Sequence, residues 1–472
     1  MPKLIVGPFN RVEGDLEVTL DVADGVVTEA RVTAPLFRGF EQILGGRAPM
    51  DALVIAPRIC GICSVSQSTA AARALAALAQ AEAPPNGRLA ADLVLACENA
   101  ADHLTHFVLF FMPDFARAAY AGRPWHGEAV RRFTANRGEA GAQLVPARAR
   151  FLHLMGLLAG KWPHSLALGP GGTTKAVDSG EKMRLLAILA EFREALEAVV
   201  FAAPLEAVAN LSSPTALENW HGGDFGLFLR IARDLALDTL GRGPKAFLSS
   251  GSFGLFAPGV LVDGAVERFD PGQVREDQTH SWLAGAAAHP FEGTTLPAAD
   301  KPGAYTWCKA PRLGGRVVEV GALARQAVSG DPLALGLVAA SGGSGNVFAR
   351  VVMRMVELAR LVIAMEGWAR ALVPGEPFCT EVTPPEAGAA VGLTEAARGT
   401  LGHWLRAEQG AITAYQIVAP TTWNFSPRDE AGTPGALEQA LAGTPVAPGE
   451  TTPIAVQHVV RSFDPCMVCT VH

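Results

Sequence analysis

Two short stretches at opposite ends of the chain decide how it folds: Arg58-Ile59-Cys60-Gly61-Ile62-Cys63 and Asp464-Pro465-Cys466-Met467-Val468-Cys469-Thr470-Val471-His472. Each contains a Cys-x-x-Cys pair, whose two thiolates lie close enough to bind one metal ion. Four such thiolates form a soft metal site, for which structural zinc is the simplest interpretation. Zinc modules, however, usually bring their pairs together within about 20 residues. About four hundred residues separate these two pairs, so a shared metal would hold both ends of the chain together.

The composition is that of a folded, apolar protein. The 472 residues are 49% hydrophobic and 18% charged, with a net charge of −7 and a mean hydropathy of +0.22. This balance excludes a disordered chain and argues against general nucleic-acid binding. We expect no membrane span, because the longest charge-free run, 332–349, is interrupted by Ser341-Gly342-Gly343-Ser344-Gly345. The apolar excess favours a wide interface with another subunit.

The pattern along the chain predicts an α+β fold in one interwoven domain, residues 1–472. We expect a core of long helices, N-terminal β-hairpin strands and peripheral α/β segments. Residues 1–50 are predicted to be mainly β, with a turn at Asp24-Gly25. Residues 51–230 and 330–410 are predicted to be mainly helical, and residues 411–472 to complete the metal site. The clearest expected helices cover residues 68–83, 91–111, 181–209 (ended or kinked by Pro204) and 347–372.

The two cysteine stretches resemble those of the large subunit of nickel–iron hydrogenases. Other segments similar to this family follow in the family's order, so the resemblance covers nearly the whole chain and implies that fold. These segments are Arg11-Val12-Glu13-Gly14, Arg38-Gly39-Phe40-Glu41, Asp102-His103-x-x-His106-Phe107, Lys309-Ala310-Pro311-Arg312, Glu319-Val320-Gly321 and Val418-Ala419-Pro420-Thr421-Thr422-Trp423-Asn424.

The resemblance implies a nickel–iron centre held by the four cysteines. Cys60 and Cys466 would be terminal nickel ligands, while Cys63 and Cys469 would bridge nickel to an iron that carries carbon monoxide and two cyanides. Soft thiolates suit a nickel that must polarise a neutral gas. In this family H2 is cleaved heterolytically and the proton passes to a nearby base, for which the Cys466 thiolate is one candidate.

The resemblance also implies residues around the metals. Arg312 would be the other base or an electrostatic clamp, held by Asp102 and Asp464, and Glu13 would carry protons away. The cyanides need hydrogen-bond donors in an apolar pocket, a role that falls to a few residues of the family segments. These are Arg312 and Thr422, with Thr421 as the alternative and Pro311 packing beside them.

A second metal ion, magnesium or a similar divalent ion, is implied near the C-terminus. Its ligands would be Glu41, the backbone carbonyl around Val418 and the final His472. Hard oxygen ligands suit magnesium, whereas an imidazole is less typical.

Three residues depart from the pattern of catalytic members. Gln67 stands where they usually carry a histidine, and glutamine cannot titrate near neutral pH. Ile62 and Phe110 are larger than the common valine and leucine, and would narrow the gas path so that H2 passes while oxygen is hindered. Ordinary core variation could explain each alone. Together they resemble the regulatory, hydrogen-sensing branch, which implies slow turnover, oxygen tolerance and a histidine protein kinase as partner.

The other cysteines, Cys97, Cys308 and Cys379, are expected to be buried thiols. They are too few for an iron–sulfur cluster, which typically needs four ligands. Electrons must therefore leave through an iron–sulfur small subunit in a heterodimer. The start of the sequence lacks a secretory signal, so we expect a cytoplasmic protein. The alternatives are an energy-converting uptake hydrogenase and, more remotely, a zinc-stapled scaffold.

Overall fold

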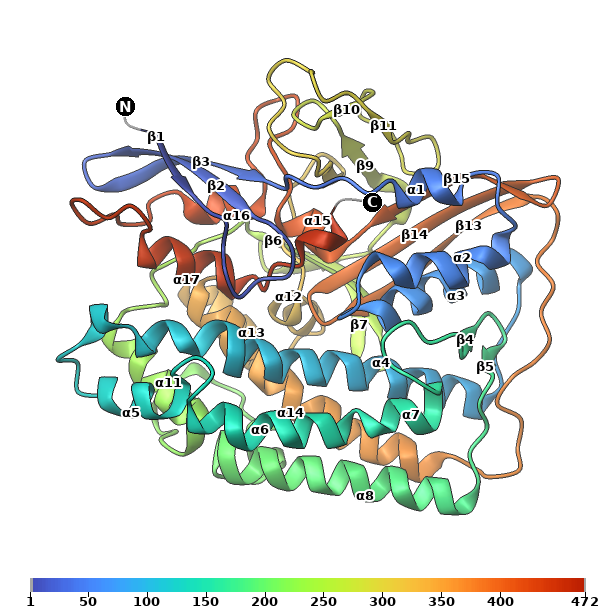
Figure 1. Ribbon diagram of the computed structural model, residues 1–472, viewed down its shortest axis with the longest axis horizontal. Coiled ribbons are helices and arrows are strands. Elements are labelled where there is room, and N and C mark those ends of the chain that lie inside the picture. Colours follow the sequence, from blue (N-terminus) through green and yellow to red (C-terminus); the bar gives the residue numbers. More distant parts are fainter. Residues whose placement is uncertain (1–2, 471–472) are drawn as a thin grey trace.

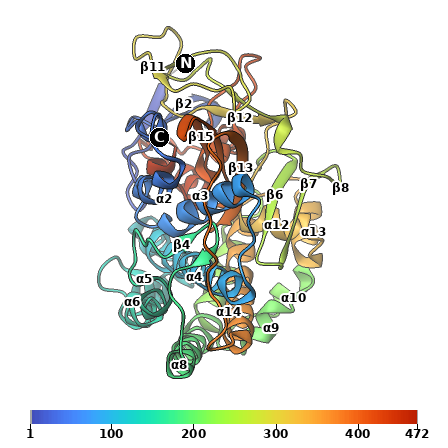
Figure 2. The same cartoon turned by 90° about the vertical axis from the view of Figure 1, so that its right-hand side faces the viewer.

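Long helices form the lower half of the molecule in the computed structural model, which describes residues 3–470. Helices α4 (Pro85–Thr105), α6 (Glu139–Phe151), α8 (Ser179–Ala195) and α14 (Val347–Ala371) run side by side, and the view turned by 90° shows them end-on (Figures 1 and 2). Strands lie above them, so the predicted α+β class with a helical core is confirmed.

Shorter helices surround this bundle. They are α1 (Phe40–Leu44), α2 (Ala52–Ile55), α3 (Ser64–Ala79), α5 (His126–Phe133), α7 (His153–Ala159), α9 (Leu205–Ala209), α10 (Pro214–Glu218), α11 (Gly223–Asp234), α12 (Ala322–Val328), α13 (Pro332–Ala340), α15 (Pro420–Asn424), α16 (Ala436–Leu441) and α17 (Ile454–Ser462). Two π-helical segments, His106–Phe111 and Leu196–Phe201, extend α4 and α8. Short 3-10 segments cover Pro49–Asp51, Ala56–Ile59, Met112–Ala116, Ala118–Tyr120, Pro271–Gln273 and Met467–Cys469.

Three antiparallel sheets and three short ribbons complete the fold. The sheets are β1 (Lys3–Val6), β2 (Glu17–Ala23) and β3 (Val26–Thr33); β6 (Ala246–Ser252), β7 (Phe256–Val262) and β8 (Ala265–Glu267); and β13 (Gly388–Ala396), β14 (Gly399–Glu408) and β15 (Ala411–Val418). The ribbons are β4 (Leu168–Gly169) with β5 (Gly172–Thr173), β9 (Val274–Asp277) with β12 (Ala310–Leu313), and β10 (Leu283–Ala284) with β11 (Leu296–Pro297). All of these strands lie within residues 3–470, the part of the chain that the structure describes.

The expected secondary structure is found with shifted boundaries. Asp24 and Gly25, both with positive φ, form the turn between β2 and β3 that the sequence predicts. The expected helix 347–372 is α14, and the expected helix 181–209 breaks ahead of Pro204. Residues 330–410, predicted to be mainly helical, also contain the whole of β13 and β14 at their end.

Helix α3 begins at Ser64 rather than at residue 68, because a buried carboxylate satisfies its first backbone N–H groups. Glu98 of α4 accepts hydrogen bonds from the backbone N–H of Val65 (2.8 Å) and of Ser66 (2.9 Å). Cys63 is therefore held at the N-terminus of α3. The helix lies tightly on β13, since a Cβ at Gly392 would come within 2.0 Å of the Ala70 carbonyl oxygen.

The polar side of α14 is buried as well as its apolar side. Arg350 forms an ion pair with Glu319 (2.8 Å), and Glu357 contacts Arg325 and His103. Buried charges of this kind are tolerated because each is paired. Within residues 3–470, none of the helices is long and apolar enough to span a lipid bilayer.

Candidate metal centre

The four cysteines of the two Cys-x-x-Cys pairs meet in one buried cluster. Their Sγ atoms all lie within 4.8 Å of one another, and each cysteine is at most 7% exposed. The Sγ–Sγ distances are 3.4 Å between Cys60 and Cys466, 3.0 Å between Cys63 and Cys469, and 3.1 Å between Cys466 and Cys469. None of these cysteines forms a disulfide. Four thiol sulfurs with this spacing can share one metal centre.

Backbone pairing between the two chain ends builds this cluster. Glu13 forms a parallel bridge with Cys466. Its N–H donates to the Pro465 carbonyl (3.4 Å) and its carbonyl accepts from the Met467 N–H (2.7 Å). Gly14 has a φ of +78°, and a Cβ there would lie 3.0 Å from Val468, so this contact needs glycine.

The four buried thiols shift one another's pKa values in opposite directions. Hydrogen bonds from the other cysteines lower the pKa of Cys60 well below its ordinary value, whereas burial raises the pKa of Cys466. A buried group of four thiolates needs compensating positive charge, which a bound metal centre supplies in place of protons. The donor set therefore fits a thiophilic metal such as zinc, nickel or iron.

An arginine that the sequence analysis missed lies beside the cluster. Arg398, at the turn between β13 and β14, forms ion pairs with Asp102 (2.9 Å) and Asp464 (3.1 Å). Its Nε also donates to the Asp464 carbonyl at 2.9 Å. Burial lowers the pKa of Arg398, but the two carboxylates and the nearby thiolates of Cys466 and Cys63 outweigh it and raise that pKa.

The two carboxyl groups at Arg398 differ in charge preference. Burial raises the pKa of Asp102 to about 7, although Arg398 opposes this shift. Burial also acts on Asp464, but Arg398 and His106 hold its pKa below the ordinary value. Arg398 therefore lies between one carboxyl group whose pKa is raised by burial and one whose pKa its charged neighbours lower.

The expected contact of Arg312 with Asp102 and Asp464 is wrong. Arg312 on β12 pairs instead with Asp429 (2.8 Å) and donates to the carbonyls of Pro427 (3.1 Å) and Thr433 (3.0 Å). The segment Lys309-Ala310-Pro311-Arg312 was expected near the metals because of its place in the order of family segments. In the structure β12 pairs with β9, and Arg312 contacts the loop 426–433. The sequence feature that could have pointed to Arg398 is the Arg398-Gly399 pair at the turn between β13 and β14.

The threonines expected near the metals are both buried on α15. The Thr421 hydroxyl accepts from the Cys466 backbone N–H at 3.3 Å, which brings it next to a cysteine of the cluster. The Thr422 hydroxyl has no hydrogen-bond partner among residues 3–470 and is available as a donor. Pro311 lies on β12 opposite Glu276 of β9.

Gln67 lies one helical turn after Cys63 and contacts a histidine that the sequence analysis did not identify. Its Oε1 is 2.7 Å from His403 Nε2, and His403 Nδ1 is 2.7 Å from the Tyr415 hydroxyl. Because an amide oxygen only accepts, Nε2 carries the proton and Nδ1 accepts from tyrosine.

Glu41 on α1 belongs to a buried polar group next to the end of β15. Its carboxylate accepts from the Ile417 N–H (2.8 Å), from the Thr295 hydroxyl and from Lys309 (3.1 Å), the first residue of the Lys-Ala-Pro-Arg segment. The neighbouring Val418 is buried at the end of β15. His472, the third expected ligand of the divalent ion, lies outside the described residues.

The remaining residues expected near the metals, and the three other cysteines, differ in how far they are buried. Glu13 is half-buried, and burial together with the Cys60 thiolate raises its pKa. Ile62 is half-buried and packs against the apolar cluster that contains the four cysteines. Phe110 is half-buried in the π-helical segment, and its carbonyl accepts from Arg11 (3.1 Å). Cys97 and Cys308 are buried as expected, but Cys379 is exposed.

Comparisons with known proteins agree with this geometry. The model of the nickel-dependent hydrogenase family matches residues 38–121 and 143–472. The chain is 31% identical to the periplasmic [NiFeSe] hydrogenase large subunit of Desulfomicrobium baculatum, covering 100% of this chain and 95% of the relative. It is 28% identical to the hydrogenase-2 large chain of Escherichia coli K12, covering 100% and 97%. The Ni-Fe-Se hydrogenase structure from D. vulgaris Hildenborough superposes with a TM-score of 0.85 at 30% identity, covering 100% of both chains.

Proposed function

The chain belongs to the nickel-dependent hydrogenase family as a large subunit and is an H2 oxidoreductase, and from this premise we propose that it works as a hydrogen sensor built on a nickel–iron centre. The observation that carries the metal assignment is the buried group of four Sγ atoms within 4.8 Å, contributed by both ends of the chain. Cys60 and Cys466 would hold the nickel, and Cys63 and Cys469 would hold both nickel and iron. Once bound, the centre supplies redox-active metals at which H2 is cleaved heterolytically.

Metal analysis of the purified heterodimer tests this assignment. We expect nickel in a one-to-one ratio to the large subunit and no zinc, and we expect Cys469→Ser to lose the nickel. Cys379→Ser is the matched control, because Cys379 is exposed and lies outside the cluster. Zinc alone in the wild-type protein would support the zinc-stapled scaffold instead.

The proton released from H2 is handled by side chains around the cluster. The Cys466 thiolate is the proposed first acceptor, and Glu13 takes the proton onward because burial raises the pKa of its carboxyl group and so favours proton uptake. Arg398 replaces Arg312 in the role of electrostatic clamp. Its guanidinium is fixed by Asp102 and Asp464, so its charge stays in place while charge on the thiolates changes.

Polar groups near the cluster would hold the diatomic ligands of the iron. Arg398 lies close enough to the Cys466 and Cys63 thiolates for their charge to raise its pKa, and Thr421 accepts from the Cys466 N–H. The Thr422 hydroxyl has no partner within residues 3–470 and can donate to such a ligand. We include carbon monoxide and two cyanides on iron in the proposal. Their infrared bands would be absent if the metal were zinc.

A divalent ion near Glu41 is a further part of the proposal. The Glu41 carboxylate and the carbonyl of Val418 are hard oxygen ligands, as magnesium prefers, and His472 would complete the protein ligands. Lys309 contacts Glu41 and Glu276 and balances the charge of the surrounding carboxylates. Magnesium content that falls in Glu41→Gln would support this site.

Electron transfer requires a partner. Among residues 3–470, the four clustered cysteines are the one group of metal-binding side chains of this kind, and the proposed nickel–iron centre uses them. The relatives are named large subunits or large chains. We therefore propose an iron–sulfur small subunit that accepts the electrons in a heterodimer.

The sensor role rests on Gln67, Ile62 and Phe110. Gln67 binds His403 in place of a titrating side chain one turn after Cys63, which is consistent with slow turnover. Ile62 packs against the apolar cluster that contains the four cysteines, and we propose that its larger side chain narrows the gas path there. The alternative, an energy-converting uptake hydrogenase, is favoured by relatives named uptake hydrogenase large subunit.

Two measurements separate these functions. A sensor would oxidise H2 slowly under air and would change the autophosphorylation of a histidine kinase when H2 is added. An uptake enzyme would turn over rapidly and leave kinase activity unchanged. Cell fractionation would test the proposed cytoplasmic location.

A further inference from the structure

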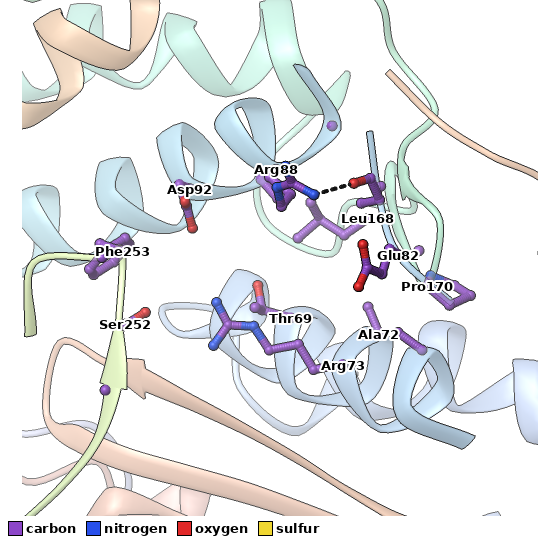
Figure 3. Close-up of a pocket in the computed structure, with 18 of the residues that line it drawn as sticks. Thr69, Ala72, Arg73, Glu82, Arg88, Asp92, Leu168, Pro170, Ser252 and Phe253 are labelled. Carbon is purple, nitrogen blue, oxygen red and sulfur yellow. Dashed lines mark hydrogen bonds between the residues drawn. The ribbon is translucent and has the colours of Figure 1, made fainter. Parts of the chain in front are cut away.

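A cavity of about 690 Å³ lies apart from the cysteine cluster. Its walls come from α3, the start of α4, the β4–β5 ribbon and the hairpin between β6 and β7 (Figure 3). None of the four cysteines lines it. This volume falls within the range of about 300–1,000 Å³ that is typical of small-molecule sites.

Two opposite charges face this cavity from neighbouring helices without forming an ion pair. Arg73 of α3 and Asp92 of α4 extend toward the space between the helices (Figure 3). Among residues 3–470, no ion pair within 4.0 Å involves Asp92, and the hydrogen bond given by Arg73 goes to the Leu393 carbonyl (2.8 Å). Burial raises the pKa of Asp92 to about 6 and lowers the pKa of Arg73, so both charges lose hydration in the cavity.

Two buried hydroxyl groups also point into the cavity. Thr69 and Ser252 are each 6% exposed, and neither side-chain oxygen has a hydrogen-bond partner within the described part of the chain. Figure 3 shows Thr69 on α3 and Ser252 at the end of β6, both directed toward the space between Arg73 and Asp92. Buried polar groups are normally hydrogen-bonded to protein or to water, so these two hydroxyls are available to a molecule that occupies the cavity.

The rest of the lining is apolar or lies at the exposed rim. Leu168, Pro170, Phe253 and Phe256 supply apolar surface. Arg88 is exposed and donates to the Ala83 carbonyl at 2.8 Å, so it closes part of the rim rather than the interior. Glu82 is exposed at the rim like Arg88, and the Ser250 hydroxyl already donates to the Thr394 carbonyl (3.1 Å). The interior of the site is thus formed by the Arg73 guanidinium, the Asp92 carboxylate, the hydroxyls of Thr69 and Ser252 and an apolar wall.

We propose that this cavity binds a small zwitterion of the amino-acid class. The ligand carboxylate pairs with Arg73, and its ammonium group pairs with Asp92. The hydroxyls of Thr69 and Ser252 complete the hydrogen bonds to these groups, and an apolar ligand side chain packs on Phe253 and Leu168. A simple anion would meet the Asp92 carboxylate and a simple cation would meet Arg73, so a ligand with both charges fits best.

Equilibrium binding to the intact heterodimer tests this inference. The probes are L-leucine and L-phenylalanine, with N-acetyl-L-phenylalanine lacking the ammonium group and L-phenylalanine amide lacking the carboxylate. We expect at least one of the two amino acids to bind with a Kd below about 1 mM. Each blocked derivative should bind at least about tenfold more weakly, because the half-buried charge of Arg73 or of Asp92 then lacks its partner.

Variants of the cavity give the second comparison. Arg73→Met and Asp92→Asn should each weaken amino-acid binding at least about tenfold. Arg184→Met is the matched control, because Arg184 is an exposed arginine of α8 outside this cavity, and its binding should equal that of the wild type. A hydrogen oxidation rate and a thermal midpoint equal to those of the wild type would show that each variant is folded. If Arg73→Met misfolds, Arg73→Lys keeps the positive charge and should still prefer the free amino acid over the amide.

Three results would overturn the inference. One is the absence of binding by either amino acid up to about 10 mM. Another is equal binding of the N-acetyl derivative, which would make the cavity an anion site. The third is unchanged binding in both Arg73→Met and Asp92→Asn, which would place the ligand elsewhere on the heterodimer.

Discussion

Replacing Arg398 by lysine keeps the positive charge beside the cysteine cluster but removes the planar fork that fixes it. Arg398 contacts Asp102 through two nitrogens (2.9 and 3.1 Å) and Asp464 through its carboxylate (3.1 Å) and backbone carbonyl (2.9 Å). A lysine ammonium is a single point donor and cannot reach both aspartates in this geometry. At least two charge-assisted hydrogen bonds are lost, each worth about 1.5–3 kcal/mol.

The expected consequence is slower hydrogen oxidation in a correctly loaded protein. Removing a fixed electrostatic donor typically lowers kcat by about 10²–10³-fold, and we expect Arg398→Lys to lie near the lower end because a charge remains. The assay is H2-dependent dye reduction at saturating H2, normalised to nickel content. Infrared bands of the iron ligands, measured on the same sample, report whether the centre is assembled.

Arg312→Lys is the matched control for this prediction. Arg312 also makes several buried hydrogen bonds and an ion pair with Asp429, but these fix the loop 426–433. We expect its normalised rate to stay within about threefold of the wild type. A rate loss in Arg312→Lys equal to that in Arg398→Lys, or a normal rate in Arg398→Lys, would refute the assignment of the clamp to Arg398.

Three further outcomes are expected. Glu13→Gln keeps the size of the side chain but cannot carry a proton, so H2 oxidation should fall about 10²-fold or more while nickel content stays normal; a normal rate would place proton exit elsewhere. The double variant Ile62→Val with Phe110→Leu should make H2 oxidation oxygen-sensitive, measured as the activity left after exposure to air, and unchanged tolerance would reject the narrow gas path. Asp114→Asn should destabilise the fold by about 3–5 kcal/mol, because the Asp114 carboxylate is the shared partner of Arg11, Arg117 and Arg461; this corresponds to a fall of about 3–5 °C in the thermal midpoint. Burial opposes ionisation of the Asp114 carboxyl group, but His458 and Arg461 lower its pKa below the ordinary value. Its contribution to folding stability is therefore fully present above the unfolded pKa of about 3.9 and is lost as the pH falls toward the folded pKa. The wild-type midpoint should therefore drop more steeply in acid than that of Asp114→Asn.

Local patterns in the sequence were sufficient for several elements. The alternation around Asp24-Gly25 predicts the β2–β3 hairpin, and apolar periodicity predicts α14 nearly to its ends. The start of α3 was predicted four residues late, because its first N–H groups are satisfied by Glu98 from another helix. A local pattern cannot contain a capping group that is supplied from a distant part of the chain.

The sequence by itself determined the two cysteine pairs and the family, because the Cys-x-x-Cys spacing and the order of the motifs can be read along the chain. Only the tertiary structure decided which arginine lies at Asp102 and Asp464. Arg312 and Arg398 both follow small residues near strand ends, and strand pairing alone directs one toward the loop 426–433 and the other toward the cluster. It likewise decided that His403 contacts Gln67, because these residues are 336 positions apart and meet only where α3 packs on the β13–β15 sheet. Long-range packing fixes such contacts, and no single stretch of sequence encodes it.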